Sequence, residues 1–289
     1  MLRKLFVIVT CEYAKELKDS AKYQKWVMSM SKNGLEVLLF VASEDICDKI
    51  EQNQDILYIT DKAFVLEALQ AKGMYTIALY HSGTTDSLFG TLFAIEDLSD
   101  METEFFHKVW QRFEGIPWHI IETDRLIIRE MCPSDLDGLY EMYEDPDVTR
   151  YTEGLFQDKE KELQYIHDYI NNVYSYYGFG TWMLVHKNGG ELIGRAGFNY
   201  RPGYEDVELG FVIGKKYWRN GFAYEACKKL LEIGKSVYEL ENVQALVMED
   251  NEASVCLLKK LGFFYQEDIE LDGQKYQKYM RNDTELTTC

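Results

Sequence analysis

The stretch Glu208-Leu-Gly-Phe-Val-Ile-Gly-Lys-Lys-Tyr-Trp-Arg-Asn-Gly-Phe-Ala-Tyr-Glu-Ala226 decides how the second half of this chain folds. Phe211 to Ile213 are β-forming residues, and the turn signal Asn220-Gly221 ends the loop that follows them. From Phe222 onward the apolar residues recur at the spacing of one helix face. We therefore predict a strand, a short loop and a helix start. Free backbone N–H groups and the helix dipole at such a start favour an anion, so the stretch predicts a phosphate site.

Further motifs lie around this stretch in a fixed order. From Glu122 to about Tyr279 the chain resembles the GNAT family of acetyl-CoA-dependent N-acetyltransferases, and within it the RimJ/RimL-type branch. The motifs that carry the resemblance are an opening strand at 122–130, an acidic helix at 135–140 followed by 145–148, and a central hairpin at 180–185 and 191–197. They continue with a pyrophosphate-binding segment at 207–226 and a last helix with the strand after it at 251–263. This resemblance implies a mixed-sheet α+β domain over residues 118–289.

Residues 1–117 form a separate pattern in which strands alternate with helices. The expected strands are Lys4–Thr10, Leu35–Val41, Ile56–Thr60, Tyr75–Tyr80 and Leu92–Ile95. The expected helices lie near Lys15–Ser31, Glu44–Gln52, Lys62–Lys72 and Met101–Glu114. Continuous apolar strands alternating with helices predict a parallel, Rossmann-like α/β sheet covered on both faces. The boundary is expected at Gly115–Trp118, where Pro117 breaks the preceding helix.

The N-terminal pattern resembles a reduced HAD-type domain in the segment from Ile56 to Asp61, in a helix that ends at Gly73 and in the later Phe93–Leu98. HAD phosphatases need an aspartate pair after the first strand, but that strand here continues into Thr10, Cys11 and Glu12. The hydroxyl of Thr60 alone cannot carry out phosphoryl transfer. We therefore expect this domain to be non-catalytic, and phosphatase activity remains the less favoured alternative.

The GNAT resemblance implies a set of residues that bind acetyl-CoA. Backbone N–H groups at the helix start would hold the pyrophosphate, and the strand before it would pair its backbone with the pantetheine arm. The implied set is Phe211, Val212, Ile213, Trp218, Arg219, Asn220, Gly221, Phe222, Ala223, Asn251 and Ser254. Trp218 stands where the family more often has Gln or Arg, a departure that is common in the RimJ/RimL-type branch. As an alternative, Trp218 and the strand residues only pack.

The resemblance also implies residues for catalysis. Glu208 is the candidate base that takes a proton from the acceptor amine, and the alternative is a surface glutamate. Asn251 is expected both to cap a helix and to contact the cofactor arm. Leu258 occupies the position at which many GNAT enzymes have an acidic tyrosine, so the usual general acid is missing. Ser254 is a substitute, and release of a free thiolate is the alternative.

The segment from Tyr151 to Gly180 is rich in aromatic residues and, by the family resemblance, lies beside the acceptor. Its members are Phe156, Tyr165, Tyr169, Tyr174, Tyr176, Tyr177 and Phe179. Such rings can form a cation–π pocket for an amine. Aromatic residues at helical spacing can equally belong to the core.

Composition excludes several classes of protein. The formal net charge of −18, most of which lies in residues 118–289, argues against nucleic-acid and anionic-membrane partners. The negative field would attract a cationic acceptor, and the alternative is that it only serves solubility. Six scattered cysteines and five histidines show no metal-ligand spacing, so we expect no metal site and a cytoplasmic protein with free thiols. No apolar run is long enough to span a bilayer, and Arg281–Cys289 is expected to be a polar tail.

The sequence thus predicts an N-acetyltransferase in which a primary amine attacks the acetyl-CoA thioester directly. The acceptor is left open between a protein N-terminus and a small cationic amine, and a homodimer is left open as the oligomeric state. The alternative function is an acyl-CoA-binding sensor or scaffold without catalysis, because Leu258 replaces the usual acid.

Overall fold

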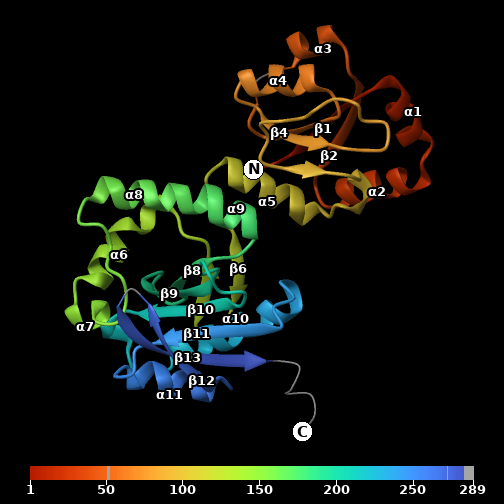
Figure 1. Cartoon of the computed structure of the whole chain (residues 1–289). Helices are drawn as coiled ribbons and strands as arrows, with labels where there is room; N and C mark the ends of the chain where they lie inside the picture. Colours follow the sequence, from red (N-terminus) through yellow and green to blue (C-terminus); the bar gives the residue numbers. More distant parts are fainter. Residues whose placement is uncertain (51–52, 272, 283–289) are drawn as a thin grey trace. The chain divides into compact units, whose positions relative to one another are not determined.

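The computed structural model describes residues 1–50, 53–271 and 273–282 and separates into two compact units, Met1–Ile116 and Pro117–Cys289 (Figure 1). The division falls one residue before the boundary expected at 117/118. Each unit has hydrophobic core clusters of its own, so each is described separately.

The first unit contains a five-stranded parallel sheet of order β2-β1-β3-β4-β5. Its strands are β1 Lys4–Val9, β2 Glu36–Val41, β3 Ile56–Thr60, β4 Tyr75–Leu79 and β5 Ala94–Ile95. Its helices are α1 Cys11–Asp19, α2 Ala21–Lys32, α3 Glu44–Lys49, α4 Ala63–Ala71, the 3₁₀ turn η1 Leu98–Asp100 and α5 Thr103–Phe113. The parallel sheet expected from the alternating pattern is confirmed, and its order is one of the two common doubly wound orders.

Alternating side chains of β1 belong to different cores of this unit. Val7 packs in the cluster that contains Trp26 of α2 and Phe106 of α5, whereas Ile8 packs in the cluster that contains Val65 of α4. Successive residues of a strand point to opposite faces, so both faces of the sheet are covered by helices, as Figure 1 shows for α3 and α4 on one side and α2 and α5 on the other.

Three expected elements of the first unit are corrected. The helix expected over 15–31 is two helices, because Ser20 adopts an extended backbone and its hydroxyl caps α2 by accepting the N–H of Tyr23. The last strand is the two-residue β5. The helix expected to reach Gln52 ends at Lys49, and residues 51–52 lie outside the described residues.

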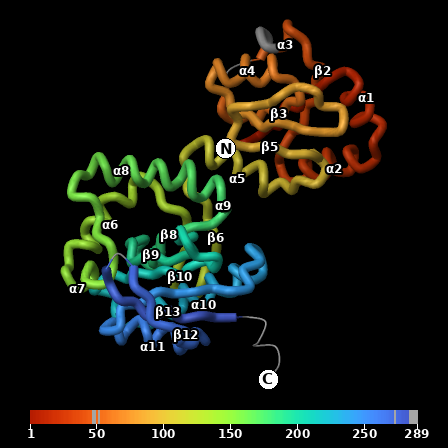
Figure 2. The backbone as a smooth tube through the Cα atoms, viewed as in Figure 1, coloured from red at the N-terminus to blue at the C-terminus, as the bar shows by residue number. Residues whose placement is uncertain are grey.

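The second unit contains a mixed eight-stranded sheet of order β12-β13-β11-β10-β9-β8-β7-β6. Its strands are β6 His119–Glu122, β7 Leu126–Arg129, β8 Thr181–His186, β9 Leu192–Asn199, β10 Val207–Ile213, β11 Asn242–Val247, β12 Phe264–Leu271 and β13 Gln274–Asn282. Figure 2 shows β12 and β13, near the blue end of the chain, at one edge of this sheet. Because β13 includes Arg281 and Asn282, the expected polar tail begins later, and residues 283–289 lie outside the described part.

Helices cover both faces of this mixed sheet. They are η2 Pro133–Asp135, α6 Leu136–Tyr143, α7 Pro146–Thr149, α8 Lys159–Asp168, the π-helix η3 Tyr169–Tyr174, α9 Ser175–Tyr177, η4 Lys215–Tyr217, α10 Phe222–Val237 and α11 Glu252–Lys260. Gly234 of α10 packs against Phe198 of β9, whereas the next residue, Asn199, accepts the hydroxyl of Tyr169 from η3. Alternation along β9 therefore places α10 on one face and the segment from α6 to α9 on the other.

Candidate functional site

The centre of the second unit's sheet opens between β10 and β11. These two strands are the parallel pair, and they pair only at Val207 with Val243 and at Glu208 with Gln244. Beyond Glu208, β10 remains paired to β9 as far as Ile213, but its other edge has no strand partner in the described residues. The backbone groups along that edge are therefore available to an extended ligand.

The loop after β10 presents unpaired backbone N–H groups to the same opening. Gly221 is the N-cap of α10 and supplies no side-chain cap, and the first helical hydrogen bond runs from Glu225 N–H to Gly221 O. Within the described part of the chain, none of the N–H groups of residues 219–224 has a protein partner with good geometry. The dipole of the sixteen-residue α10 points at this cluster of donors, and both features favour an anion at this position.

The backbone conformation of the loop depends on two residues with positive φ. Gly221 has φ 80° and Arg219 has φ 61°. The strand–loop–helix expected over 208–226 is confirmed, and the left-handed conformation explains why glycine stands at 221. Trp218 donates its indole N–H to Ile213 O at 2.6 Å, so this side chain ties the loop back to the end of β10 while its ring stays exposed.

A clamp that the sequence pattern did not reveal holds the start of α10. The carboxylate of Glu225 accepts the Thr123 hydroxyl at 2.5 Å, the Arg125 backbone N–H at 2.9 Å and the Arg125 Nε–H at 2.6 Å. Arg125 also donates to Asn220 O at 2.9 Å and lies 4.2 Å from the centre of the Phe222 ring. Burial by itself raises the pKa of Glu225, but the Thr123 and Arg125 donors outweigh it and hold that pKa below its ordinary value.

Glu208 lies at the last position where β10 pairs with β11, and its carboxylate already forms an ion pair. Arg201 donates its Nε–H to Glu208 Oε2 at 2.5 Å and a second N–H to Oε1 at 3.3 Å. The Glu208 side chain is only 13% exposed. A carboxylate has about four lone-pair positions, so two remain open to an amine.

Beside Glu208 lies a buried polar atom that the sequence pattern also missed. Gln244 is fully buried; its Nε2 donates to Asp206 O at 2.9 Å, and its Oε1 has no hydrogen-bond partner in the described residues. Strand pairing places Gln244 directly opposite Glu208, at the point where β10 and β11 separate. Only the parallel pairing, which is a long-range feature, brings these two residues together.

The start of α11 has the capping geometry expected for Asn251. Its side-chain oxygen accepts the Ser254 N–H at 3.2 Å, and Ser254 itself is half-buried. Leu258, on the same stripe of the helix, is fully buried. No acidic side chain therefore replaces the missing tyrosine at that position, and Ser254 is the hydroxyl on this stripe.

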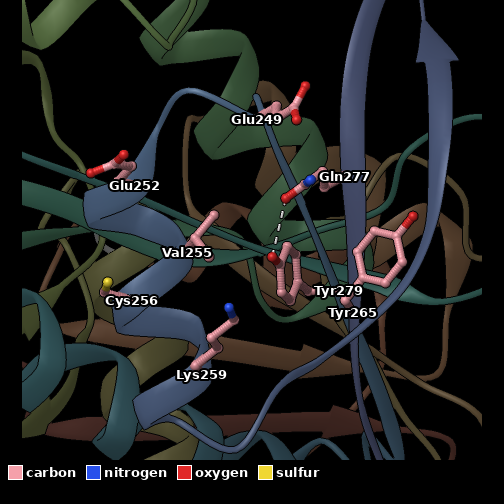
Figure 3. Close-up of a pocket in the computed structure, with 8 residues that line it drawn as sticks. All are labelled: Glu249, Glu252, Val255, Cys256, Lys259, Tyr265, Gln277 and Tyr279. Carbon is pink, nitrogen blue, oxygen red and sulfur yellow. Dashed lines mark hydrogen bonds between the residues drawn. The ribbon is translucent and has the colours of Figure 1, made fainter.

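A groove on another stripe of α11 is separate from these residues. It has a volume of about 460 Å³ and is lined by Glu249, Glu252, Val255, Cys256, Lys259, Tyr265, Gln277 and Tyr279. Figure 3 shows these side chains between α11 and the β12–β13 hairpin. None of the residues expected to bind the cofactor is among the residues that line this groove, so the groove is described apart from the expected cofactor site.

The aromatic segment before β8 divides between core and surface. Tyr169, Tyr174 and Phe179 are buried, and the Tyr169 and Tyr174 hydroxyls bond to Thr181 N–H and Thr181 O. The exposed members are Phe156, Tyr165, Tyr176 and Tyr177. The alternative of core packing therefore holds for the buried rings, and a cation–π pocket remains a prediction for the exposed ones.

The carboxyl edge of the first unit's sheet holds a closed polar cluster. Asp61, which is buried, accepts the Thr10 backbone N–H at 3.1 Å and the Thr10 hydroxyl at 3.0 Å, and it lies 3.0 Å from His81 Nε2. The His81 ring in turn stacks on Tyr13 with ring centres 3.6 Å apart. Both carboxylate oxygens of Asp61 therefore already accept hydrogen bonds from Thr10.

The described residues hold neither a metal-binding group nor a membrane-spanning helix. Residues 1–50, 53–271 and 273–282 contain no group of three or more His, Cys, Asp or Glu side chains that could hold a metal ion. Among these same residues, no helix is both long and apolar enough to cross a bilayer.

Comparison with known proteins agrees with the fold described above. Residues 125–264 match the family model described as an acetyltransferase (GNAT) domain. The uncharacterized N-acetyltransferase YoaA of Bacillus subtilis (strain 168) is 34% identical over 170 residues, which cover 58% of this chain and 94% of that protein. The uncharacterized N-acetyltransferase p20 of Bacillus licheniformis is 32% identical over 143 residues, or 49% of this chain and 80% of that one.

A solved structure assigned to the GnaT family of acetyltransferases, from Bordetella pertussis, covers 57% of this chain and 99% of its own, with 23% identity and a TM-score of 0.50. At this identity the likeness shows the fold alone. The second unit thus has the fold of an acetyltransferase (GNAT) domain. The chain belongs to the GNAT family and is an acetyl-CoA-dependent N-acetyltransferase.

Proposed function

We propose that the second unit binds acetyl-CoA between β10 and β11 and transfers the acetyl group to a primary amine by direct attack on the thioester. The observation that carries this proposal is the coincidence of two features at one place: the unpaired edge of β10 and the free N–H groups of residues 219–224. The first fits an extended pantetheine arm, and the second fits the pyrophosphate.

The residues of this chain would then divide the work as follows. Phe211, Val212 and Ile213 offer backbone groups to the pantetheine, Arg219 to Ala223 hold the pyrophosphate, and Trp218 keeps the loop against β10. Asn251 and Ser254, at the start of α11, would line the other side of the opening. The RimJ/RimL-type branch, a cytoplasmic location and a homodimer remain predictions.

The chemical step needs a neutral amine and a place for the released thiol. The amine nitrogen forms a bond to the thioester carbonyl carbon, Glu208 accepts the proton that the ammonium loses, and collapse of the tetrahedral species breaks the C–S bond. The nitrogen of the tetrahedral species loses its second proton, and the leaving thiolate gains one, by relay through the Ser254 hydroxyl or through water. Because Leu258 is buried and apolar, no side chain at that position donates it.

The non-catalytic role predicted for the first unit forms the second part of the proposal. The occupied oxygens of Asp61 and the absence of an aspartate after β1 support it. Kinship with HAD-type domains remains a prediction, because a parallel doubly wound sheet is shared by many families.

The test of the cofactor site is calorimetric titration with acetyl-CoA of Gly221→Val and of the matched variant Gly262→Val. Both glycines have positive φ, 80° and 88°, and in neither would a Cβ meet an atom closer than 3.7 Å, so the backbone strain is comparable. We expect the Kd of Gly221→Val to rise at least about tenfold, since each lost bond to a charged group costs about 1.5–3 kcal/mol. Equal affinities in the two variants would reject the site.

The test of the base is Glu208→Gln compared with Arg201→Gln. Thiol release at saturating amine is expected to fall about 100-fold or more in Glu208→Gln, a typical contribution of general-base catalysis, with the Kd of acetyl-CoA unchanged. Arg201→Gln removes the cation but keeps the carboxylate, so turnover should persist. If Glu208→Gln turns over at the wild-type rate across a pH series, Glu208 is not the base.

A further inference from the structure

Arg195 occupies an unusual position in the middle of the GNAT sheet. It lies on β9, paired in register with Val212 of β10 and with Met183 of β8. Strand alternation places its side chain on the face of Asn199, which is the face covered by α6 to α9. A half-buried cation therefore stands one strand away from the segment proposed to hold the thioester.

Three tyrosines surround its guanidinium. The Arg195 Cζ lies 5.0 Å from the centre of the Tyr143 ring. Burial raises the pKa of Tyr143, Tyr165 and Tyr169, and the positive charge of Arg195 offsets part of that rise in each of them. The guanidinium is therefore close to α6, α8 and η3 at once.

No carboxylate of the described chain forms an ion pair with Arg195. Glu208, on the neighbouring strand β10, is paired with Arg201, and Glu162 accepts the Phe156 backbone N–H at 2.9 Å. Burial raises the pKa of Tyr143, and the side chains of Arg195 and Thr152 beside its hydroxyl offset part of that rise, although neither forms a hydrogen bond of good geometry with it. An arginine offers five donors in a fork that matches a carboxylate, so a half-buried arginine without such a partner is arranged for an anion from outside.

We propose that Arg195 binds a carboxylate of the acceptor, and that the acceptor is a small amine carrying a carboxylate next to its amino group, that is, an amino acid. The inference rests on the proposed function. The amine must reach a thioester held along β10, the strand that pairs with β9 at Arg195, and neighbouring strands are about 4.8 Å apart. We therefore place the carboxylate bound by Arg195 and the reacting nitrogen within one small acceptor molecule.

The charge of Arg195 also separates acceptor classes. A polyamine would bring a second cation towards the guanidinium, which costs free energy in a partly buried site. An amino acid would place its carboxylate on Arg195 and its ammonium on the side of Glu208. The competing explanation is that Arg195 only stacks on Tyr143, and this explanation predicts no dependence on the acceptor's carboxylate.

The experiment measures acetyl-CoA-dependent thiol release by the full-length protein with the common amino acids, each compared with its methyl ester. The ester keeps the amine and removes the negative charge. Polyamines and peptides with free N-termini complete the panel. We expect kcat/KM for the preferred amino acid to exceed that of its ester on the order of 10- to 100-fold, the range for hydrogen bonds to a charged group.

The variants Arg195→Gln and Arg195→Lys then test the residue, with Arg3→Gln, at an exposed position of the first unit, as the matched control. Arg195→Gln should raise KM for the amino acid about 10- to 100-fold, leave the ester unaffected and leave the Kd of acetyl-CoA unchanged. Arg195→Lys, which keeps the charge and is the fallback if the glutamine variant does not fold, should recover part of the discrimination.

Two results would overturn the inference while leaving the proposed function intact. One is equal turnover of amino acids and their esters, or turnover of polyamines or peptides only. The other is an equal loss for acid and ester in both Arg195 variants. In contrast, absence of acetyl-CoA binding in the wild type would overturn the proposed function itself.

Discussion

Single residues decide whether the anion site of α10 is held in place. Glu225 lies in the first turn of α10, where an acidic side chain reads as an ordinary helix-start residue, yet its carboxylate joins the turn before β7 to this helix. The clamp is made of residues about 100 positions apart in the chain. The residue type at position 225 therefore controls the geometry of the loop that presents the backbone N–H groups before α10.

The clamp makes stability depend on pH with a definite sign. Because the pKa of Glu225 is lower in the folded state than in the unfolded chain, its contribution is present above the unfolded value of about 4.3 and is lost as pH falls through the folded value. We expect Glu225→Gln to lower the free energy of unfolding by about 1–3 kcal/mol at neutral pH. Urea unfolding at several pH values checks this.

The difference between the wild type and Glu225→Gln should shrink when the pH is lowered below about 4. Glu232→Gln, in the same helix with an exposed lysine partner, is the control and should be nearly neutral. A difference between wild type and Glu225→Gln that stays constant down to the lowest pH would contradict the role of the carboxylate charge.

At the scale of elements, α11 shows how one side chain can serve folding and binding. Asn251 caps this helix by accepting the Ser254 N–H. Asn251→Ala should therefore lower the melting temperature by about 2–4 °C, the equivalent of a lost cap of about 1 kcal/mol. Asn251→Ser keeps a capping oxygen but shortens the side chain, so it should keep the melting temperature and weaken acetyl-CoA binding. Thermal melts with calorimetry measure both quantities.

Ser20→Ala is a matched control for the capping effect, since Ser20 caps α2 of the first unit in the same way. It should lower stability without changing the Kd of acetyl-CoA. If Asn251→Ser binds acetyl-CoA as tightly as the wild type, Asn251 is a cap and nothing more.

At the scale of the whole molecule, the chain consists of two units with separate cores. Leu126, Trp182 and Leu230 belong to the core of the second unit, whereas the clusters around Leu5 and Ile8 lie entirely in the first. Every residue assigned to the acetyl-CoA site lies in the second unit. The cofactor site should therefore not need residues 1–116.

This separation predicts that residues 117–289 expressed alone bind acetyl-CoA with a Kd within about twofold of that of the full chain, as expected for independent parts. Calorimetry of both proteins tests the prediction, with residues 1–116 as a control that should not bind. A large loss of affinity in the shorter protein would mean that the first unit contributes to the site.

The sequence predicted the elements that depend on neighbouring residues. The strand, loop and helix over 208–226 and the cap at Asn251 follow from local spacing, because turns, caps and helix periodicity act over a few residues. The break at Ser20 was missed because apolar spacing continues across it, while the capping hydroxyl of Ser20 ends one helix and begins the next.

The sequence by itself determined the family, the two-unit organisation and the type of ligand, because these rest on motif order and on a backbone that only glycine adopts easily at position 221. Tertiary structure alone decided which charged side chains have an ion-pair partner within the protein. It paired Glu208 with Arg201, bound Glu225 to Arg125 and left Arg195 without a carboxylate. Such partners come from strand pairing and loop packing between distant segments, and no local spacing encodes them.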